Sequence, residues 1–290
     1  MKIEPDYTPY GEASIIDSTE LVRPPILFLG GWQQNPRLMH GVQRELARQL
    51  NAPSIGMSAF DVTELSSQVD APLDEALAED KLLTEIPLAM IKKAQILREL
   101  AGFALHRKLK QRPETVIAHC AGANVLLLAR YIDDLLQVES CLPHQGVLVE
   151  PMIVEDRSIR QVTKETLAFD KLTKAEPQRY ISLQSLQADN AKKVGMEGAK
   201  PMLEILGSRG MTLLFEAFGR GDDFRLLVGE NDIAAPAHDI VTELEEVDLS
   251  DRLYHYETQP RTGHGFLLAE PVLAVTSLRA ILEAQASSKD

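Results

Sequence analysis

The apolar residues of this chain form short unbroken runs that alternate with longer stretches of helical period. The clearest run is residues 26–31, Ile-Leu-Phe-Leu-Gly-Gly, which follows two prolines and ends on two glycines. An unbroken apolar run bounded by turn residues is typical of a strand that is buried on both faces. Similar runs predict further strands at 53–60, 115–118, 146–150, 224–228 and 253–257.

Helices are predicted where apolar residues recur every three or four positions. Residues 88–110 form the longest such stretch, and their basic carboxyl end suits the negative end of a helix dipole. The same period predicts helices at 36–50, 121–137 and 270–285. Residues 62–86 are acidic and weakly periodic, so they are predicted to form a loop.

Strands that alternate with helices predict an α/β fold with a mostly parallel, doubly wound sheet. Residues 152–222 interrupt this alternation, because they are helical in character and carry many glycines. We interpret them as a helical insertion that covers the sheet as a cap. This interpretation divides the core into a first part, 1–151, and a second part, 223–290.

The composition excludes several classes of function. The 290 residues carry a formal net charge of −13, which argues against binding to nucleic acid or to an anionic membrane surface. The sequence has no run of about 18 uncharged apolar residues and no signal-peptide core at its start. Two cysteines cannot form a disulfide framework. We therefore expect a cytoplasmic protein in a reducing compartment.

The junction between the strand 115–118 and the helix 121–137 is the most informative segment. It places Cys120 between a buried strand and a helix, with the small residues Ala118 and Gly122 two positions away on either side. Such a turn is sharp and strained, and it exposes the middle side chain above the sheet. The helix N-terminus beneath it would stabilise a thiolate. The alternative is an inert buried cysteine at an ordinary junction.

This turn resembles the nucleophile elbow of the α/β-hydrolase fold, whose usual form is Gly-x-Ser-x-Gly. Ala118 stands in place of the first glycine, and Cys120 stands in place of the serine. The chain is therefore similar to the minority of this superfamily with cysteine nucleophiles, such as dienelactone hydrolases and polyhydroxyalkanoate synthases. The resemblance covers about residues 20–285 as architecture, and no subfamily is recognised.

The resemblance implies an acid and then a base, each on a loop after a later strand. Asp232 lies where the family has its acid, and His264 lies where it has its base. Asp232 could instead be a turn or capping residue, with Glu230 beside it and Glu150 at a rarer acid position. His264 could be a turn histidine between glycines, and His119 is expected to pack under the site. The order of the three signals along the chain favours the triad Cys120, Asp232 and His264.

The resemblance also implies an oxyanion hole. One donor would be the backbone N–H of Ala121, the residue after the nucleophile. The other would be the N–H of Trp32, in a loop where Gly30 replaces the histidine that the family often has. A glycine pair after a strand can also be a simple tight turn.

These residues predict an acyl-enzyme on Cys120. A thiolate leaves more readily than an alkoxide, so activated acyl groups such as esters of good leaving groups, thioesters or lactones suit it better than amides. Water as acceptor would make the protein a hydrolase, whereas an alcohol, amine or thiol would make it an acyltransferase or condensing enzyme. Two further alternatives are a non-catalytic binding protein of the same fold and an engineered replacement of a native serine by Cys120.

The expected partner is a small-molecule acyl substrate, free or bound to a carrier. No cofactor and no metal are expected, because the sequence has neither a phosphate-binding glycine pattern nor metal-ligand spacing. Apolar residues late in the predicted cap could line an acyl pocket or could pack within the cap. They are Leu203, Leu206, Met211, Leu213, Leu214, Phe215 and Phe218.

Overall fold

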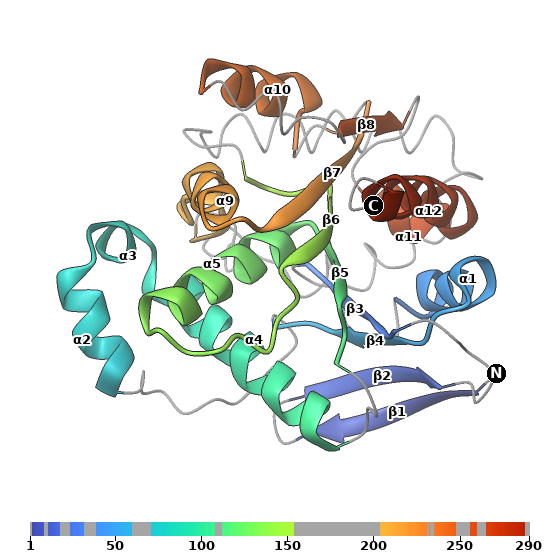
Figure 1. Cartoon of the computed structure of the whole chain (residues 1–290), viewed down its shortest axis with the longest axis horizontal. Helices are drawn as coiled ribbons and strands as arrows, with labels where there is room; N and C mark the ends of the chain where they lie inside the picture. Colours follow the sequence, from blue (N-terminus) through green and yellow to red (C-terminus); the bar gives the residue numbers. More distant parts are fainter. Residues whose placement is uncertain are drawn as a thin grey trace, which may run out of the picture.

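The structure is a computed structural model that describes residues 2–8, 11–17, 24–31, 39–59, 71–107, 112–153, 204–230, 232, 235–247, 256–259 and 265–287. Within these residues eight strands form one sheet, in the order β1-β2-β4-β3-β5-β6-β7-β8 (Figure 1). The strands are β1 (Lys2–Thr8), β2 (Gly11–Asp17), β3 (Ile26–Leu29), β4 (Ser54–Met57), β5 (Thr115–His119), β6 (Gln145–Val149), β7 (Asp223–Gly229) and β8 (Tyr256–Gln259).

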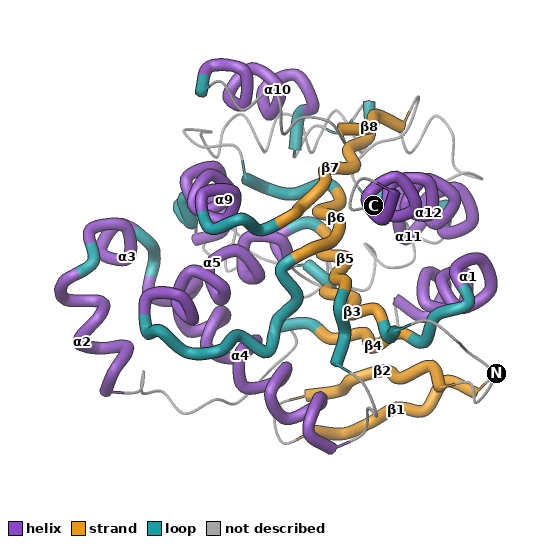
Figure 2. Tube along the Cα trace, viewed as in Figure 1, coloured by secondary structure: helices purple, strands orange, loops and turns teal. Residues whose placement is uncertain are grey.

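In the sheet, the neighbouring strands β4, β3, β5, β6, β7 and β8 are all parallel. The pairs β1–β2 and β2–β4 are antiparallel. Helices cover both faces of the sheet (Figure 2). This arrangement confirms the predicted mostly parallel, doubly wound sheet. The helices are α1 (His40–Leu50), α2 (Ala71–Glu79), α3 (Lys81–Glu85), α4 (Leu88–Arg107), α5 (Ala121–Leu135), α9 (Gly210–Gly219), α10 (Ala237–Glu246), α11 (Phe266–Ala269) and α12 (Pro271–Ser287).

Side chains of β3 alternate between two hydrophobic cores, one on each face of the sheet. Leu27 and Leu29 pack in the core under α4, α5 and α9, whereas Ile26 and Phe28 pack in the core under α1 and α12. A strand buried on both faces needs apolar residues at every position, which explains the unbroken run in the sequence. None of the helices in the described ranges is long and apolar enough to cross a membrane.

The predicted loop at 62–86 was wrong in its second half, because this part forms α2 and α3. Leu73 of α2 and Leu83 of α3 are fully buried against the core. Asp80 caps α3, since its carboxylate accepts a hydrogen bond from the Leu83 N–H at 2.8 Å. Tertiary packing and one cap therefore stabilise helices that the weak period did not reveal.

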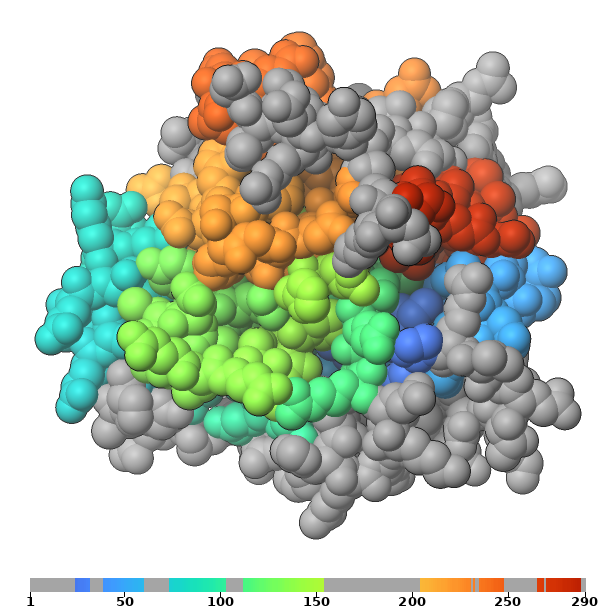
Figure 3. All heavy atoms as spheres, viewed as in Figure 1, coloured from blue at the N-terminus to red at the C-terminus, as the bar shows by residue number. Residues whose placement is uncertain are grey.

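Residues 154–203, most of the predicted cap, lie outside the described residues, so the division at 152–222 stays a prediction. The end of the segment that is described belongs to the main core. Within α9, four apolar side chains lie in the core that α5 also lines: Met211, Leu213, Leu214 and Phe218. In Figure 3 the orange atoms of α9 continue into the green surface of the α5–β6 region. These four residues therefore pack against the sheet domain.

Candidate active site

Cys120 occupies the turn between β5 and α5, at the carboxyl edge of the parallel strands. The prediction that this turn exposes the side chain was wrong, because Cys120 packs in the core with only 5 % of its surface exposed. Its backbone has φ 56° and ψ −134°, a conformation that only glycine adopts without strain. Its N–H donates to the Val149 carbonyl of the neighbouring strand at 2.9 Å, which fixes the turn to the sheet. Strained backbone of this kind persists where the surrounding structure imposes it and is concentrated at functional sites.

Two glycines make room for this turn. A Cβ on Gly122 would lie 2.7 Å from the carbonyl oxygen of Gly30, so the first turn of α5 packs directly on the end of β3. A Cβ on Gly31 would lie 2.6 Å from Cys120 Cβ and 3.1 Å from Cys120 Sγ. The loop after β3 therefore reaches the thiol, as an oxyanion loop must.

Ala121 is the first residue of α5, and the first four N–H groups of a helix have no partner within it. Its position next to Cys120 is the one that an oxyanion donor requires. Trp32, the other predicted donor, lies outside the described residues, although Gly30 and Gly31 before it are described.

Asp232 follows β7 and is buried, with 4 % of its surface exposed, whereas the neighbouring Glu230 is exposed. Burial favours Asp232 over Glu230 as a functional acid. Asp232 also shapes its turn, because Oδ1 accepts from the Ala235 N–H at 2.9 Å.

His264 lies outside the described residues, but the chain directly after it is described. Gly265 caps α11 with φ 87°, and Phe266 and Leu267 are buried in the core under α1 and α12. The loop that carries the predicted base is therefore anchored immediately after His264.

His119 packs under the turn, as expected, and is fully buried. Its Nε2 lies 2.7 Å from Oε2 of Glu150, which is also fully buried, at the end of β6. The same Oε2 accepts from the Gly265 N–H at 2.7 Å. The sequence suggested Glu150 only as an alternative acid, and these contacts were missed because they join three distant segments.

Asn124 lies one turn of α5 after Cys120 and is also fully buried. Its Nδ2 donates to the Met152 carbonyl at 2.8 Å and to Ser208 Oγ at 2.7 Å. The side chain of Asn124 therefore joins α5 to both Met152 and Ser208, close to the nucleophile turn.

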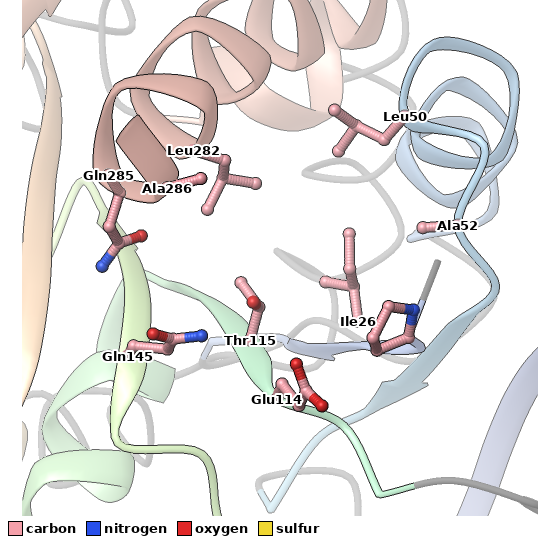
Figure 4. A pocket seen from close by; sticks show the side chains of 10 residues that line it. Ile26, Leu50, Ala52, Glu114, Thr115, Gln145, Leu282, Gln285 and Ala286 are labelled. Carbon is pink, nitrogen blue, oxygen red and sulfur yellow. The ribbon is translucent and has the colours of Figure 1, made fainter. Parts of the chain in front are cut away.

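A cavity of about 320 Å³ lies at the opposite, amino edge of the sheet (Figure 4). It opens between α1 and α12, above the first residues of β3, β5 and β6. No predicted catalytic residue lines it. Within the described ranges, no group of three or more His, Cys, Asp or Glu side chains could hold a metal ion.

No protein-family model matches the sequence, and no curated protein is significantly similar to it. Solved structures do share its architecture. Carboxyl esterase 2 from the mycorrhizal fungus Tuber melanosporum is similar with a TM-score of 0.55 and 14 % identity, over 98 % of this chain and 83 % of that one. A provisionally assigned lipase from Acinetobacter baumannii AYE is similar with a TM-score of 0.55 and 16 % identity, over 98 % of this chain and 93 % of that one.

Esterase B from Lactobacillus rhamnosis, inhibited by a tributyrin phosphonate, is similar with a TM-score of 0.50 and 15 % identity, over 99 % of this chain and 88 % of that one. At such low identities the likeness shows the fold, which is that of the α/β hydrolases.

Proposed function

We propose that the protein is an acyl hydrolase of the α/β-hydrolase fold that forms a thioester acyl-enzyme on Cys120. The observation that carries the proposal is the backbone of Cys120, which is strained at the turn between β5 and α5, beside Gly31. An inert buried cysteine gives no reason for such strain. The esterase and lipase names of the similar structures agree with the proposed class of reaction.

In the proposed first step His264 takes the proton of the Cys120 thiol, and Asp232 orients the imidazole. The sulfur forms a bond to the acyl carbonyl carbon, whose oxygen becomes an oxyanion held by the N–H groups of Ala121 and Trp32. Each such donor contributes about 3 kcal/mol to stabilising the transition state. The carbon–leaving-group bond then breaks, and His264 gives its proton to the leaving group.

In the proposed second step His264 takes a proton from water, and the water oxygen bonds to the thioester carbon. The carbon–sulfur bond breaks, the carboxylic acid leaves, and Cys120 regains its proton. The cycle converts an acyl donor and water into an acid and the free leaving group, and it needs no cofactor.

Chemistry at sulfur determines the substrate class of this proposal. A thiolate is a better leaving group than an alkoxide or an amide anion, so a tetrahedral intermediate from an amide would expel sulfur and revert. A thioester, a strained or enol lactone, or an ester with a good leaving group avoids this reversal. We therefore propose a small activated acyl substrate. The predicted cap, 152–222, would cover it, and two residues of this segment, Met152 and Ser208, bond to Asn124 beside the nucleophile turn.

Acylation followed by intact mass spectrometry tests the proposal. Purified protein mixed with a p-nitrophenyl ester or a thioester is expected to gain one acyl group. Cys120→Ala should gain none. Cys141→Ala should be acylated like the wild type, because Cys141, the other free thiol, follows the C-terminal end of α5, whereas Cys120 precedes its first residue. Acylation confined to Cys141, or no acylation, would overturn the proposal.

The acceptor is determined in the same experiment. Release of free acid from the isolated acyl-enzyme in buffer supports hydrolysis. Faster loss of the adduct when an alcohol, amine or thiol is added, with the acyl group found on that acceptor, would favour the acyltransferase instead. Asp232→Asn and His264→Asn are each expected to slow acylation by about 100-fold or more.

A further inference from the structure

One buried carboxylate oxygen connects the two loops that carry the proposed nucleophile and base. Glu150 Oε2 lies 2.7 Å from His119 Nε2 and accepts from the Gly265 N–H at 2.7 Å. His119 immediately precedes Cys120, and Gly265 immediately follows His264. Consecutive Cα atoms are about 3.8 Å apart, so each contact is one residue away from a proposed catalytic group.

One oxygen of Glu150 makes both contacts. Oε2 accepts from the Gly265 N–H, and its contact with His119 Nε2 is a second hydrogen bond whose donor is set by the tautomer of the imidazole. Both side chains are fully buried, so water does not compete for the oxygen.

The backbone at Glu150 is held in an unusual conformation for this contact. Glu150 has φ 49°, which glutamate rarely adopts, and its N–H donates to the Leu227 carbonyl of β7 at 2.8 Å. Gly265 has φ 87°, which only glycine adopts readily. The chain is thus bent at Glu150, just after β6, and again at Gly265, just before α11, where these two segments meet.

We propose that Glu150 is a positioning residue that fixes the loop of His264 relative to Cys120. This inference rests on the proposed function, since it assigns Glu150 a role in that reaction. Glu150 acts through the His119 ring and the Gly265 backbone, which distinguishes it from Asp232, whose proposed partner is the His264 side chain. Its effect is on the rate of acylation and not on substrate binding.

The test compares Glu150→Gln with Asp133→Asn in the full-length protein. Asp133 is a matched control, because it is also buried and paired, with Arg98, but it lies near the far end of α5. Single-turnover acylation with p-nitrophenyl acetate is measured over a range of ester concentrations, which separates the maximal rate constant from the half-saturating concentration. Hydrogen exchange of the peptide that contains residues 265–270 is measured beside it.

Glu150→Gln is expected to lower the maximal acylation rate constant by about 100-fold, the loss typical of a misplaced reacting group. The half-saturating concentration should stay within about twofold, since uniform binding is unchanged. Exchange of the 265–270 peptide should become faster. Asp133→Asn should leave both the acylation rate constant and the exchange of the 265–270 peptide unchanged, even where it lowers the melting temperature.

A second pair of variants serves if Glu150→Gln does not fold. His119→Gln keeps a donor near the position of Nε2 and should retain most of the acylation rate, whereas His119→Leu should lose it. Equal rates in these two variants, or a Glu150→Gln variant with wild-type acylation and exchange, would overturn the positioning role. A wild type that forms no adduct on Cys120 would instead overturn the proposed function, while the exchange experiment would still report whether Glu150 holds the loop.

Discussion

At Cys120 the proposed chemistry and the stability of the backbone make opposite demands. The side chain is required for the proposed chemistry, but φ 56° and ψ −134° are unfavourable for any residue with a Cβ. Such strain costs about 1–3 kcal/mol per residue. The fold therefore gives up stability at the position where the proposed reaction needs its sulfur, although Cys120 is itself buried.

Replacing Cys120 by glycine and by alanine measures this strain directly. Both variants lose the sulfur, but only glycine relieves the backbone. We expect Cys120→Gly to be more stable than Cys120→Ala by about 1 kcal/mol or more, the reverse of the usual order in regular structure. Urea unfolding of the two variants gives the difference. If the alanine variant is the more stable, the turn is not strained as described.

The sequence predicted this turn because its determinants are local. Ala118 and Gly122 flank Cys120 at fixed spacing, and a buried strand and an amphipathic helix adjoin it. The role of Glu150 could not be predicted in the same way. Its contacts with His119 and Gly265 span 31 and 115 positions of the chain, and no local pattern records such a distance.

Whole elements show the same contrast between features set by local sequence and features set by contacts with distant segments. The parallel strands were predicted because a strand buried on both faces is apolar at every position, as in β3. The antiparallel β1 and β2 were not predicted, since Lys2–Thr8 carries charged residues and a proline that disguise an edge strand. The short α2 and α3 were not predicted either, because contacts with distant elements stabilise them.

One of those contacts can be tested through pH. Asp80 accepts from the Leu83 N–H with Oδ1 and from the Tyr131 hydroxyl with Oδ2, at 2.8 and 2.9 Å, so it joins α3 to α5. Burial, and then the hydrogen bond with Asp80, raise the pKa of Tyr131 above its ordinary value. The hydroxyl therefore stays protonated in the folded protein at a pH where it ionises in the unfolded chain.

We expect Tyr131→Phe to be less stable than the wild type by about 1 kcal/mol at neutral pH, because one hydrogen bond is lost. Above a pH of about 10, the unfolded wild type gains stability by ionising Tyr131, whereas the folded wild type does not. The difference between the two proteins should therefore shrink as the pH rises from 8 to 11. Urea unfolding at both values measures it, and a constant difference would contradict the assigned environment of Tyr131.

At the scale of the whole molecule the two edges of the sheet differ in role. The residues assigned to chemistry follow the carboxyl ends of the strands, where ligands bind in folds of this class. A buried ion pair lies at the amino edge instead. Arg130 of α5 donates from Nε to Asp222 at 2.9 Å and from Nη1 to the Leu142 carbonyl at 2.9 Å, just before β7 and β6 begin. This pair should contribute to folding and not to catalysis.

Arg130→Met tests this division. Removing one partner of a buried pair costs about 3–5 kcal/mol. Arg220 remains 3.5 Å from Asp222 and offsets part of its charge, so we expect a loss at the lower end of this range, about 3 kcal/mol of unfolding free energy. Arg48→Met is the matched control, because Arg48 forms an exposed pair with Glu45 and its loss should lower the stability far less than the loss of Arg130. Urea unfolding measures both.

The acylation rate of Cys120 in Arg130→Met, measured where the variant is fully folded, should equal that of the wild type. Arg130 lies more than two turns of α5 beyond the nucleophile, so its loss should lower the amount of folded protein without moving Cys120. A folded Arg130→Met that acylates markedly more slowly would show that the two edges are coupled. The placement of the loops around Cys120 would then depend on packing along all of α5, and not on the contacts at its first turn alone.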